Sequence, residues 1–235
     1  MTKHRVWELD AFRGLCILGM VFVHFMYDLA DLYQIIDWEY PAWFSLMKNW
    51  GGVLFVLISG ICATIGKRSV KRGLVVMGCG LIVSAVTFGM YKFGFHKSII
   101  IYFGVLHCLG ACMILWWLCK RLPTWVLAVL GVAMIVAGLY LTTIYPVDHL
   151  WLMPLGILPR GFLTSDYFPL LPNFGYFLIG AVIGRTVYRK KDTIFPRINP
   201  KNLLIRPLSF CGRHSLLIYL LHQPILSGIC MLLQK

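Results

Sequence analysis

The chain has 235 residues, of which 59% are hydrophobic and only 13% are charged, and its mean hydropathy is +0.77. Soluble globular domains carry about 25% charged residues, so the composition excludes an ordinary soluble protein and indicates a membrane protein. The formal net charge of +13 would also suit a nucleic-acid-binding protein. The basic residues, however, stand in short clusters beside apolar runs, which is the distribution that the positive-inside rule describes. We therefore expect a lipid bilayer, and no nucleic acid, as the partner of the chain.

Apolar runs of about 20 residues predict an all-α membrane protein with a single bundle of seven transmembrane helices. The first run is too long and bears too much acid for a cleaved signal peptide, so we expect it to be retained. We expect one integral-membrane domain over residues 1–235 with its N-terminus inside and its C-terminus outside, because the basic clusters fall on one side of the membrane. The predicted helices are 11–31, 50–66, 73–91, 99–119, 124–144, 173–189 and 208–232.

The first run carries four ionisable residues, Asp10, Arg13, His24 and Asp28. At about 100° per residue on a helix, Asp10 and Asp28 point the same way, and Arg13 and His24 lie within about 60° of them. An ionisable group at membrane depth costs about 2.5 kcal/mol or more. The four residues, which we call the polar stripe, should therefore face the protein interior.

Small residues and cysteines of the other predicted helices suit packing. The helices at 50–66 and 73–91 are rich in Gly, Ser and Ala, and Gly180 and Gly184 have the small-xxx-small spacing of close helix crossings. The eight cysteines show no metal-ligand or redox spacing, so we interpret them as buried hydrophobic residues.

Two further histidines, His107 and His222, lie in predicted helices. At about 1.5 Å per residue from the cytoplasmic ends, His24, His107 and His222 lie roughly 20, 18 and 21 Å deep. Three histidines at one depth, one of them a turn from Asp28, favour general acid–base chemistry over packing. Zinc ranks lower and no metal is expected, because no pair has the H-x-x-x-H spacing.

The polar segments outside the apolar runs leave alternatives open. The basic stretch 185–206 is either a topology determinant that attracts anionic lipid headgroups or a landing surface for a phosphate-bearing ligand. In the long outer loop, Asp166 and Tyr167 either bind a sugar or serve as turn or cap residues.

Four blocks, residues 5–29, 99–110, 165–185 and 212–226, span most of the chain. Together they resemble the bacterial branch of the heparan-alpha-glucosaminide N-acetyltransferase catalytic-domain family. The first helix is also similar to that of membrane acyltransferases that O-acetylate surface polysaccharides, in which Arg, ten residues and a catalytic His correspond here to Arg13 and His24. In the lysosomal members Asn stands where this chain has His24, and their catalytic His lies in the following outer segment. The blocks are RVWELDAFRGLCILGMVFVHFMYDL, IIIYFGVLHCLG, SDYFPLLPNFGYFLIGAVIGR and GRHSLLIYLLHQPIL.

The resemblance implies a multi-pass enzyme of the bacterial cytoplasmic (inner) membrane that transfers an acyl group, usually acetyl, from cytosolic acyl-CoA to a sugar amine or hydroxyl outside. The implied partners are acyl-CoA, a glycan or other extracytoplasmic acceptor and the bilayer, with homo-oligomerisation left open. His24, Asp28, His107 and His222 are then expected in catalysis. The expected donor-binding residues are Arg13, Asp10, Arg213, Ser215 and Tyr219, and the expected acceptor-binding residues are Asp166 and Tyr167.

Two other functions use the same residues. A proton-coupled transporter or lipid-handling protein could employ the intramembrane histidines as a relay, although the chain shows no inverted repeat. A structural or regulatory membrane subunit would need them only for stability.

Overall fold

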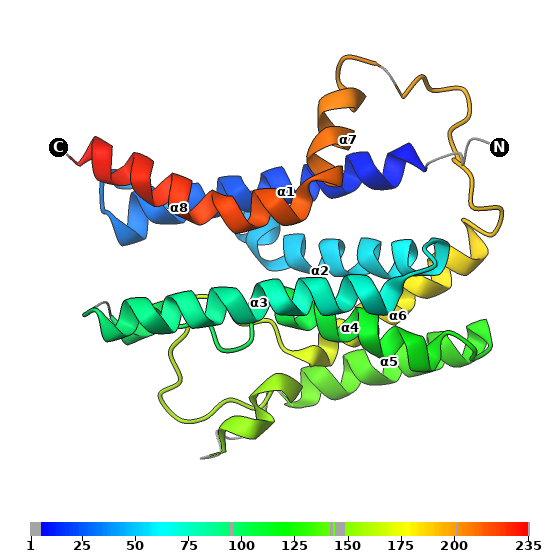
Figure 1. The fold of residues 1–235 in the computed structure, drawn as a ribbon, viewed down its shortest axis with the longest axis horizontal. Coiled ribbons are helices and arrows are strands. Elements are labelled where there is room, and N and C mark those ends of the chain that lie inside the picture. Colours follow the sequence, from blue (N-terminus) through cyan, green and yellow to red (C-terminus); the bar gives the residue numbers. More distant parts are fainter. Residues whose placement is uncertain (1–5, 95, 142, 144–148, 201, 235) are drawn as a thin grey trace. The chain divides into compact units, whose positions relative to one another are not determined.

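The computed structural model describes residues 6–94, 96–141, 143, 149–200 and 202–234 (Figure 1). The chain is 73% helical, and its described residues contain no strand. The π-helix η1 (Asp28–Leu32) and two 3₁₀ turns, η2 (Lys97–Ile99) and η3 (Leu150–Leu155), supplement the α-helices. The α-helices are α1 (Trp7–Tyr27), α2 (Ala42–Ile65), α3 (Ser69–Lys92), α4 (Val105–Cys119), α5 (Thr124–Leu141), α6 (Leu170–Thr186), α7 (Ile205–Arg213) and α8 (Ser215–Leu233).

The predicted class, an all-α membrane protein, is confirmed. Five helical segments of the described chain are long and apolar enough to cross a membrane: Trp7–Leu32, Ala42–Ile65, Ser69–Lys92, Thr124–Leu141 and Ser215–Leu233. The remaining two predicted spans correspond to α4, with 15 residues, and α6, with 17. The number of seven membrane crossings therefore stays a prediction.

Some helix boundaries differ from the predicted ones for local reasons. Helix α2 begins at Ala42 directly after Pro41, because proline has no N–H to leave unsatisfied at a helix start. Helix α4 begins only at Val105, because Gly104 is extended, with φ −92° and ψ −172°. The last predicted helix is divided into α7 and α8 at His214, whose φ of −104° and ψ of 17° depart from helical values.

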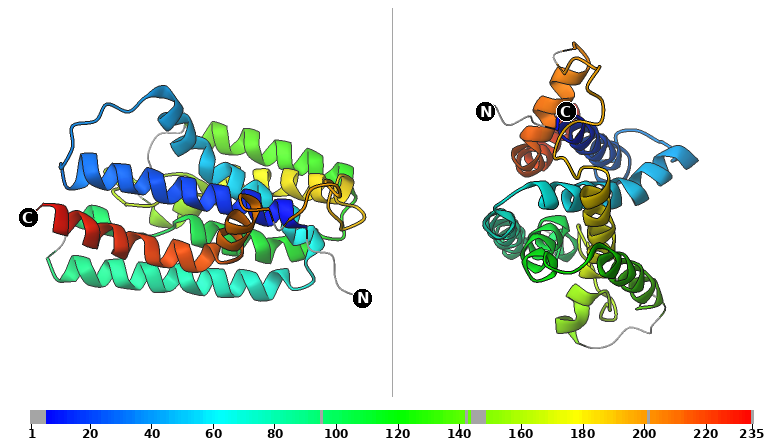
Figure 2. Two further views of the ribbon diagram at one scale, coloured as in Figure 1. Left: turned by 90° about the horizontal axis from the view of Figure 1, so that it is seen from above. Right: turned by 90° about the vertical axis from the view of Figure 1, so that its right-hand side faces the viewer.

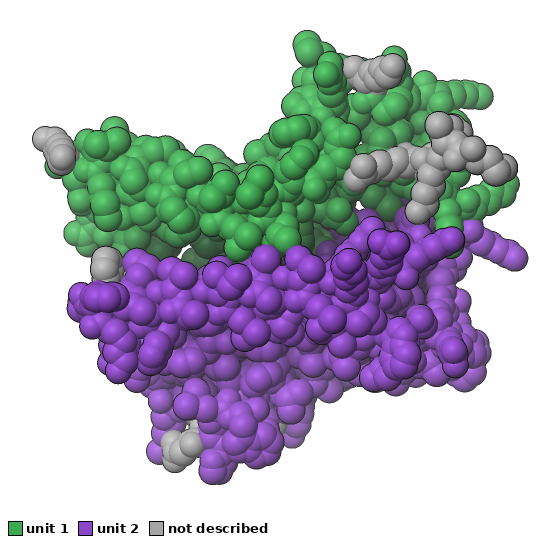
Figure 3. Space-filling model, in the orientation of Figure 1, with its two compact units in different colours: residues 1–55, 190–235 green, residues 56–189 purple. Residues whose placement is uncertain are grey.

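The chain forms two compact units (Figure 3). Unit 1 contains residues 1–55 and 190–235, and unit 2 contains residues 56–189, so that α2 contributes to both. In unit 1, α8 runs along α1, whereas α7 stands across it (Figures 1 and 2). At the crossing a Cβ on Gly14 would collide with the Leu208 carbonyl, and one on Gly212 with the Asp10 carbonyl. The two backbones therefore touch directly.

Glycines also set the helix contacts of unit 2. A Cβ on Gly60 of α2 would collide with the Phe177 carbonyl of α6, and one on Gly180 would collide with the Leu57 carbonyl. Between α3 and α4, a Cβ on Gly73 would lie 2.8 Å from the Gly110 carbonyl oxygen. The packing role that the sequence predicted for these small residues is confirmed.

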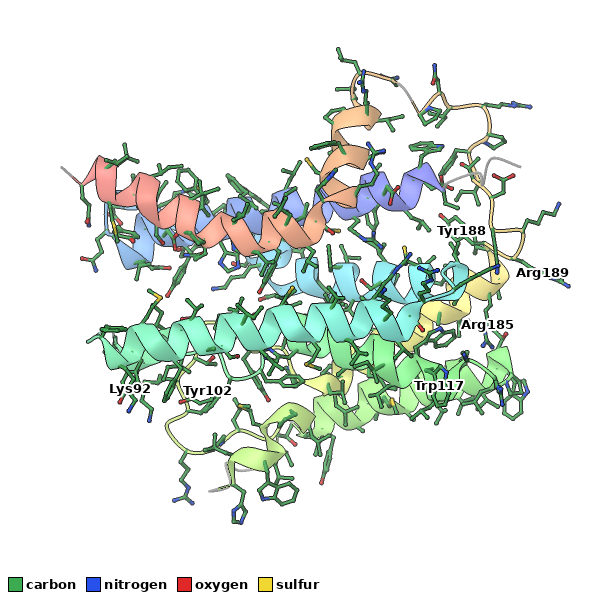
Figure 4. The ribbon with its side chains drawn as sticks, in the orientation of Figure 1. Lys92, Tyr102, Trp117, Arg185, Tyr188 and Arg189 are labelled. Atoms are coloured by element: carbon green, nitrogen blue, oxygen red, sulfur yellow. The ribbon has the colours of Figure 1, made fainter. Side chains whose placement is uncertain are left out.

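Arg185, one of the predicted cytoplasmic cations, connects helix ends within unit 2 (Figure 4). Its guanidinium donates to the carbonyls of Lys120 and Leu122, both at 2.6 Å, just beyond the end of α4. It also lies over the Trp116 ring, 5.2 Å from the centroid. This arginine satisfies carbonyls that the helix end and the following turn leave without a helical partner.

We expect Gly60→Ala to lower the free energy of unfolding by about 1–3 kcal/mol, because the added methyl group overpacks the α2–α6 contact. Gly78→Ala in α3 is the matched control, since nothing lies within 4 Å of a Cβ built there. Thermal unfolding in detergent measures both variants. Equal melting temperatures for the two would contradict the backbone contact.

Candidate functional site

The polar stripe of α1 lies against the protein. Asp10 and Asp28 are buried, at 9% and 1% exposure, and Arg13 and His24 are half-buried. The exposed side chains of the same helix are apolar, among them Phe12, Leu15, Leu18 and Phe22. The predicted orientation of the stripe is confirmed, and the helix can present hydrocarbon to lipid on its other side.

Asp28 begins the π-helical turn η1, whose backbone is closed by a 2.8 Å hydrogen bond from the Tyr33 N–H to the Asp28 carbonyl. Single π-turns inside α-helices often occur at functional sites. Gln223 of α8 donates from Nε2 to both Asp28 carboxylate oxygens, at 3.1 and 2.9 Å. Gln234 donates to the Tyr33 carbonyl at 2.7 Å and joins the same two segments at their ends. The buried carboxylate thus has its hydrogen-bond donor on the neighbouring helix.

His24 and His222 face each other across the α1–α8 contact. Their ring centroids are 5.0 Å apart and their planes meet at 69°. Nδ1 of His222 lies 2.5 Å from the Tyr219 carbonyl oxygen. Because a carbonyl can only accept, Nδ1 is the nitrogen that carries the proton in this hydrogen bond. The pair therefore offers imidazole nitrogens suited to proton transfer beside a buried carboxylate.

The crossing of α1 and α7 carries three of the residues predicted to bind the acyl-CoA donor: Asp10, Arg13 and Arg213. Asp10 and Arg13 form an i,i+3 ion pair at 4.0 Å. Gly212 packs on the Asp10 backbone, and the adjacent Arg213 is exposed, with its Nε donating to the Ser209 carbonyl at 3.2 Å. This places three of the predicted donor residues at one end of the polar stripe.

The other two predicted donor residues, Ser215 and Tyr219, lie on α8, which starts next to the crossing. The Tyr219 ring centroid lies 5.3 Å from that of His222. The first turns of α8 thus connect the crossing to the histidine pair.

His107 belongs to unit 2, and hydrogen bonds engage both of its ring nitrogens. The Gly104 N–H donates to Nδ1 at 3.3 Å, and Nε2 lies 3.3 Å from the Ser84 hydroxyl. That hydroxyl donates to the Ile101 carbonyl at 2.6 Å, so its oxygen accepts from Nε2. The ring also packs on Gly80. This arrangement is typical of a histidine that joins helix ends, and the catalytic role of His107 and its common depth with the other two stay predictions.

The two predicted acceptor residues hold the loop between α5 and α6 of unit 2 in contact with its neighbours. Asp166 accepts from the Val105 N–H at 2.9 Å and so caps the start of α4, and its carboxylate occupies the place of a Cβ on Gly104. The Tyr167 hydroxyl donates to the Met153 carbonyl at 2.8 Å. Burial raises the pKa of Tyr167 to about 12, so the phenol stays protonated and able to donate at neutral pH. The cap interpretation of Asp166 is confirmed, and binding of an acceptor stays a prediction.

The sequence predicts no role for two polar residues of these contacts, Gln223 and Ser84. The position of Gln223, directly after His222 in an apolar run, could have predicted its contact, because an amide at membrane depth needs a polar partner. Ser84 resembles the other small residues of its helix, and nothing in the sequence points to its bond with His107.

The cysteines and histidines of the described chain form no metal centre, since no group of three His, Cys, Asp or Glu side chains there is placed to hold an ion. The described cysteines are free thiols, and Cys108, Cys112 and Cys230 are fully buried. The predicted burial is confirmed for these three, whereas the other five cysteines are only half-buried.

We expect Asp166→Ala to lower the free energy of unfolding by about 1–3 kcal/mol, because it leaves a backbone N–H of α4 without an acceptor. Asp166→Asn keeps an oxygen acceptor and should lose less. Thermal unfolding separates the two, with Asp37→Ala, at an exposed position, as the control. Equal losses in the Ala and Asn variants would contradict the cap.

Comparison with known proteins gives one result that bears on function. The family "Heparan-alpha-glucosaminide N-acetyltransferase, catalytic" matches residues 5–224 of the 235. Neither a curated protein nor a solved structure shows a significant match. The family match covers the polar stripe, the histidine pair and the outer loop, and it supports a membrane acetyltransferase type of function. The chain belongs to the heparan-alpha-glucosaminide N-acetyltransferase catalytic-domain family.

Proposed function

We propose that this protein is a transmembrane acyltransferase that moves an acetyl group from cytosolic acyl-CoA to a sugar amine or hydroxyl on the extracytoplasmic side. The observation that carries the proposal is the His24–His222 pair, with ring centroids 5.0 Å apart, one helical turn from Asp28, whose buried carboxylate accepts from Gln223. Membership of an acetyltransferase family supplies the reaction type. A bacterial cytoplasmic membrane is the proposed location.

The reaction requires a base. An acceptor hydroxyl or ammonium must lose a proton before it attacks the thioester carbonyl; the new C–O or C–N bond forms as the C–S bond breaks. We assign proton abstraction to His24. The proton then passes to the departing CoA sulfur, so that acyl-CoA and a hydroxyl acceptor become the ester and free CoA. An ammonium acceptor releases one further proton, which passes to the solvent, as the amide forms.

His222 and Asp28 support that step. A buried carboxylate near the histidine pair favours the positive charge that His24 acquires when it takes the proton. Gln223 holds this carboxylate in place through its two hydrogen bonds. His222, oriented by the Tyr219 carbonyl, is in ring contact with His24 and can exchange a proton with it through a bound acceptor or water.

The donor-side proposal rests on charge. A guanidinium has five N–H donors, so the pairing of Arg13 with Asp10 leaves donors for the phosphates of CoA. Arg213 at the same crossing adds a second cation, and Ser215 and Tyr219 follow toward the histidine pair. Arg13 and His24 are roughly 16 Å apart by helical rise, a length that suits an extended pantetheine arm.

Unit 2 supplies the proposed acceptor side. Asp166 and Tyr167 shape the loop before α6 through their bonds to Val105 and Met153, and we propose that this loop contributes acceptor contacts. His107 is proposed to act through its bonds to Gly104 and Ser84, by which it fixes the start of α4.

We expect His24→Ala to lower the rate of acetyl transfer by about 10²–10⁴-fold, the usual contribution of a general base, while acetyl-CoA still binds. Transfer of radiolabelled acetyl to surface glycans in proteoliposomes is the measurement. His149→Ala, at an exposed position, is the control for loss of a histidine. Transfer at the unmutated rate in His24→Ala would contradict the assignment of His24 as the base. If the wild-type protein transferred no acetyl group but showed uptake driven by a pH gradient, it would be a transporter.

Gln223→Ala should lower kcat by about 10- to 100-fold, the range for groups that orient active-site ligands, with little change in KM for acetyl-CoA. Gln234→Ala is the matched control, because it removes the amide of the residue directly after α8, which donates to a backbone carbonyl and not to Asp28. Steady-state kinetics separates the two parameters. An equal loss of kcat in both variants would indicate that Gln223 only joins the helices.

A further inference from the structure

The segment 190–213 combines positive charge with exposed apolar side chains, and the candidate site uses only Arg213 from it. Its sequence contains six basic residues and one acidic residue, Asp192. Leu203 and Leu204 are 87% and 75% exposed, and Phe210 is 54% exposed. The basic residues are Lys190, Lys191, Arg197, Lys201, Arg206 and Arg213, of which Lys201 lies outside the described residues.

Two attachments fix this segment to the N-terminal end of α1. Near its start, Glu8 of α1 accepts from the Thr193 hydroxyl at 2.9 Å and from the Ile194 N–H at 2.8 Å, and Trp7 contacts the Phe195 ring. At its end, Gly212 packs on the Asp10 backbone. The part between these points therefore stays at one end of a helix that is long enough to cross the membrane.

Helix α7 has the orientation and composition of an interfacial helix. It stands across α1 (Figure 1), so when α1 crosses the bilayer, α7 lies along its surface. One side of α7 packs on α1 through Leu208 and Gly212, while Arg206 and Phe210 are exposed. Basic and apolar residues side by side at this depth match a boundary between anionic headgroups and acyl chains.

We propose that residues 190–213 form an anchor that binds the headgroups of anionic phospholipids, with Leu203, Leu204 and Phe210 inserted among the acyl chains. Charge complementarity selects anionic over zwitterionic lipid, because the segment carries five more positive than negative charges. Apart from Arg213, which belongs to the proposed donor site, the anchor takes no part in the acyl-transfer chemistry, and its test does not require that chemistry.

The test is lipid binding by the full-length protein in detergent, with equal amounts of phosphatidylglycerol and phosphatidylcholine, followed by native mass spectrometry. The wild type should retain phosphatidylglycerol preferentially. The variant K190Q/K191Q/R197Q/R206Q should lose at least tenfold in apparent affinity, while K67Q/R68Q/K71Q/R72Q, which removes four exposed charges elsewhere, should change less than twofold. Equal losses in both variants, or none in either, would overturn the proposal.

Two further arms separate the alternatives. Added CoA should not displace the bound lipid; displacement would assign the segment to the phosphates of CoA. Leu203→Gln with Leu204→Gln keeps every charge and should still weaken lipid retention, whereas full retention would overturn the insertion of these leucines.

Hydrogen exchange in nanodiscs is an independent measurement. Backbone exchange over 190–213 should slow when phosphatidylglycerol replaces part of the phosphatidylcholine, and unchanged exchange would overturn the anchor.

Discussion

The cost of an ionisable group at membrane depth governs unit 1. Asp28 is 1% exposed on a helix whose other side is apolar, and a carboxylate in that position needs donors from a neighbour. Gln223 of α8 provides them through Nε2, which fixes α8 against the π-turn of α1. The contact that satisfies the carboxylate also brings His222 next to His24, so the stability requirement and the proposed chemistry share one helix pair.

Backbone contacts without side chains complete this arrangement. Because Gly14 and Gly212 allow α1 and α7 to touch, Arg213 lies beside the turn that carries Asp10 and Arg13. Lipid is as apolar as leucine, so close packing of this kind, and not hydrophobic burial, holds membrane helices together. The crossing therefore joins the proposed donor site to the basic segment 190–213, which Glu8 also binds through the Ile194 N–H, at one end of α1.

Identical residue types have different roles in the two units. His107 has a backbone N–H on Nδ1 and a serine oxygen at Nε2, which fixes its tautomer and engages both nitrogens. His222 directs Nδ1 toward a carbonyl and stands in ring contact with His24. Asp28 and Asp166 differ in the same way, one held by a side-chain amide beside histidines and the other capping a helix.

The sequence by itself determined the helical membrane class, the buried side of α1 and the small-residue contacts, because hydropathy and helical period act on each segment separately. It also determined the family, through residues spread over most of the chain. Only the tertiary structure decided that Gln223 meets Asp28, that His107 meets Ser84 and that Asp166 caps α4, because these pairs are 195, 23 and 61 positions apart in the chain. The bond from the Gly104 N–H to His107 depends on the loop conformation before α4. The break at His214 is also a feature of the tertiary structure, because the apolar run 208–232 predicts a single helix. In the structure α7 packs closely across α1, and the chain changes direction at His214 before α8.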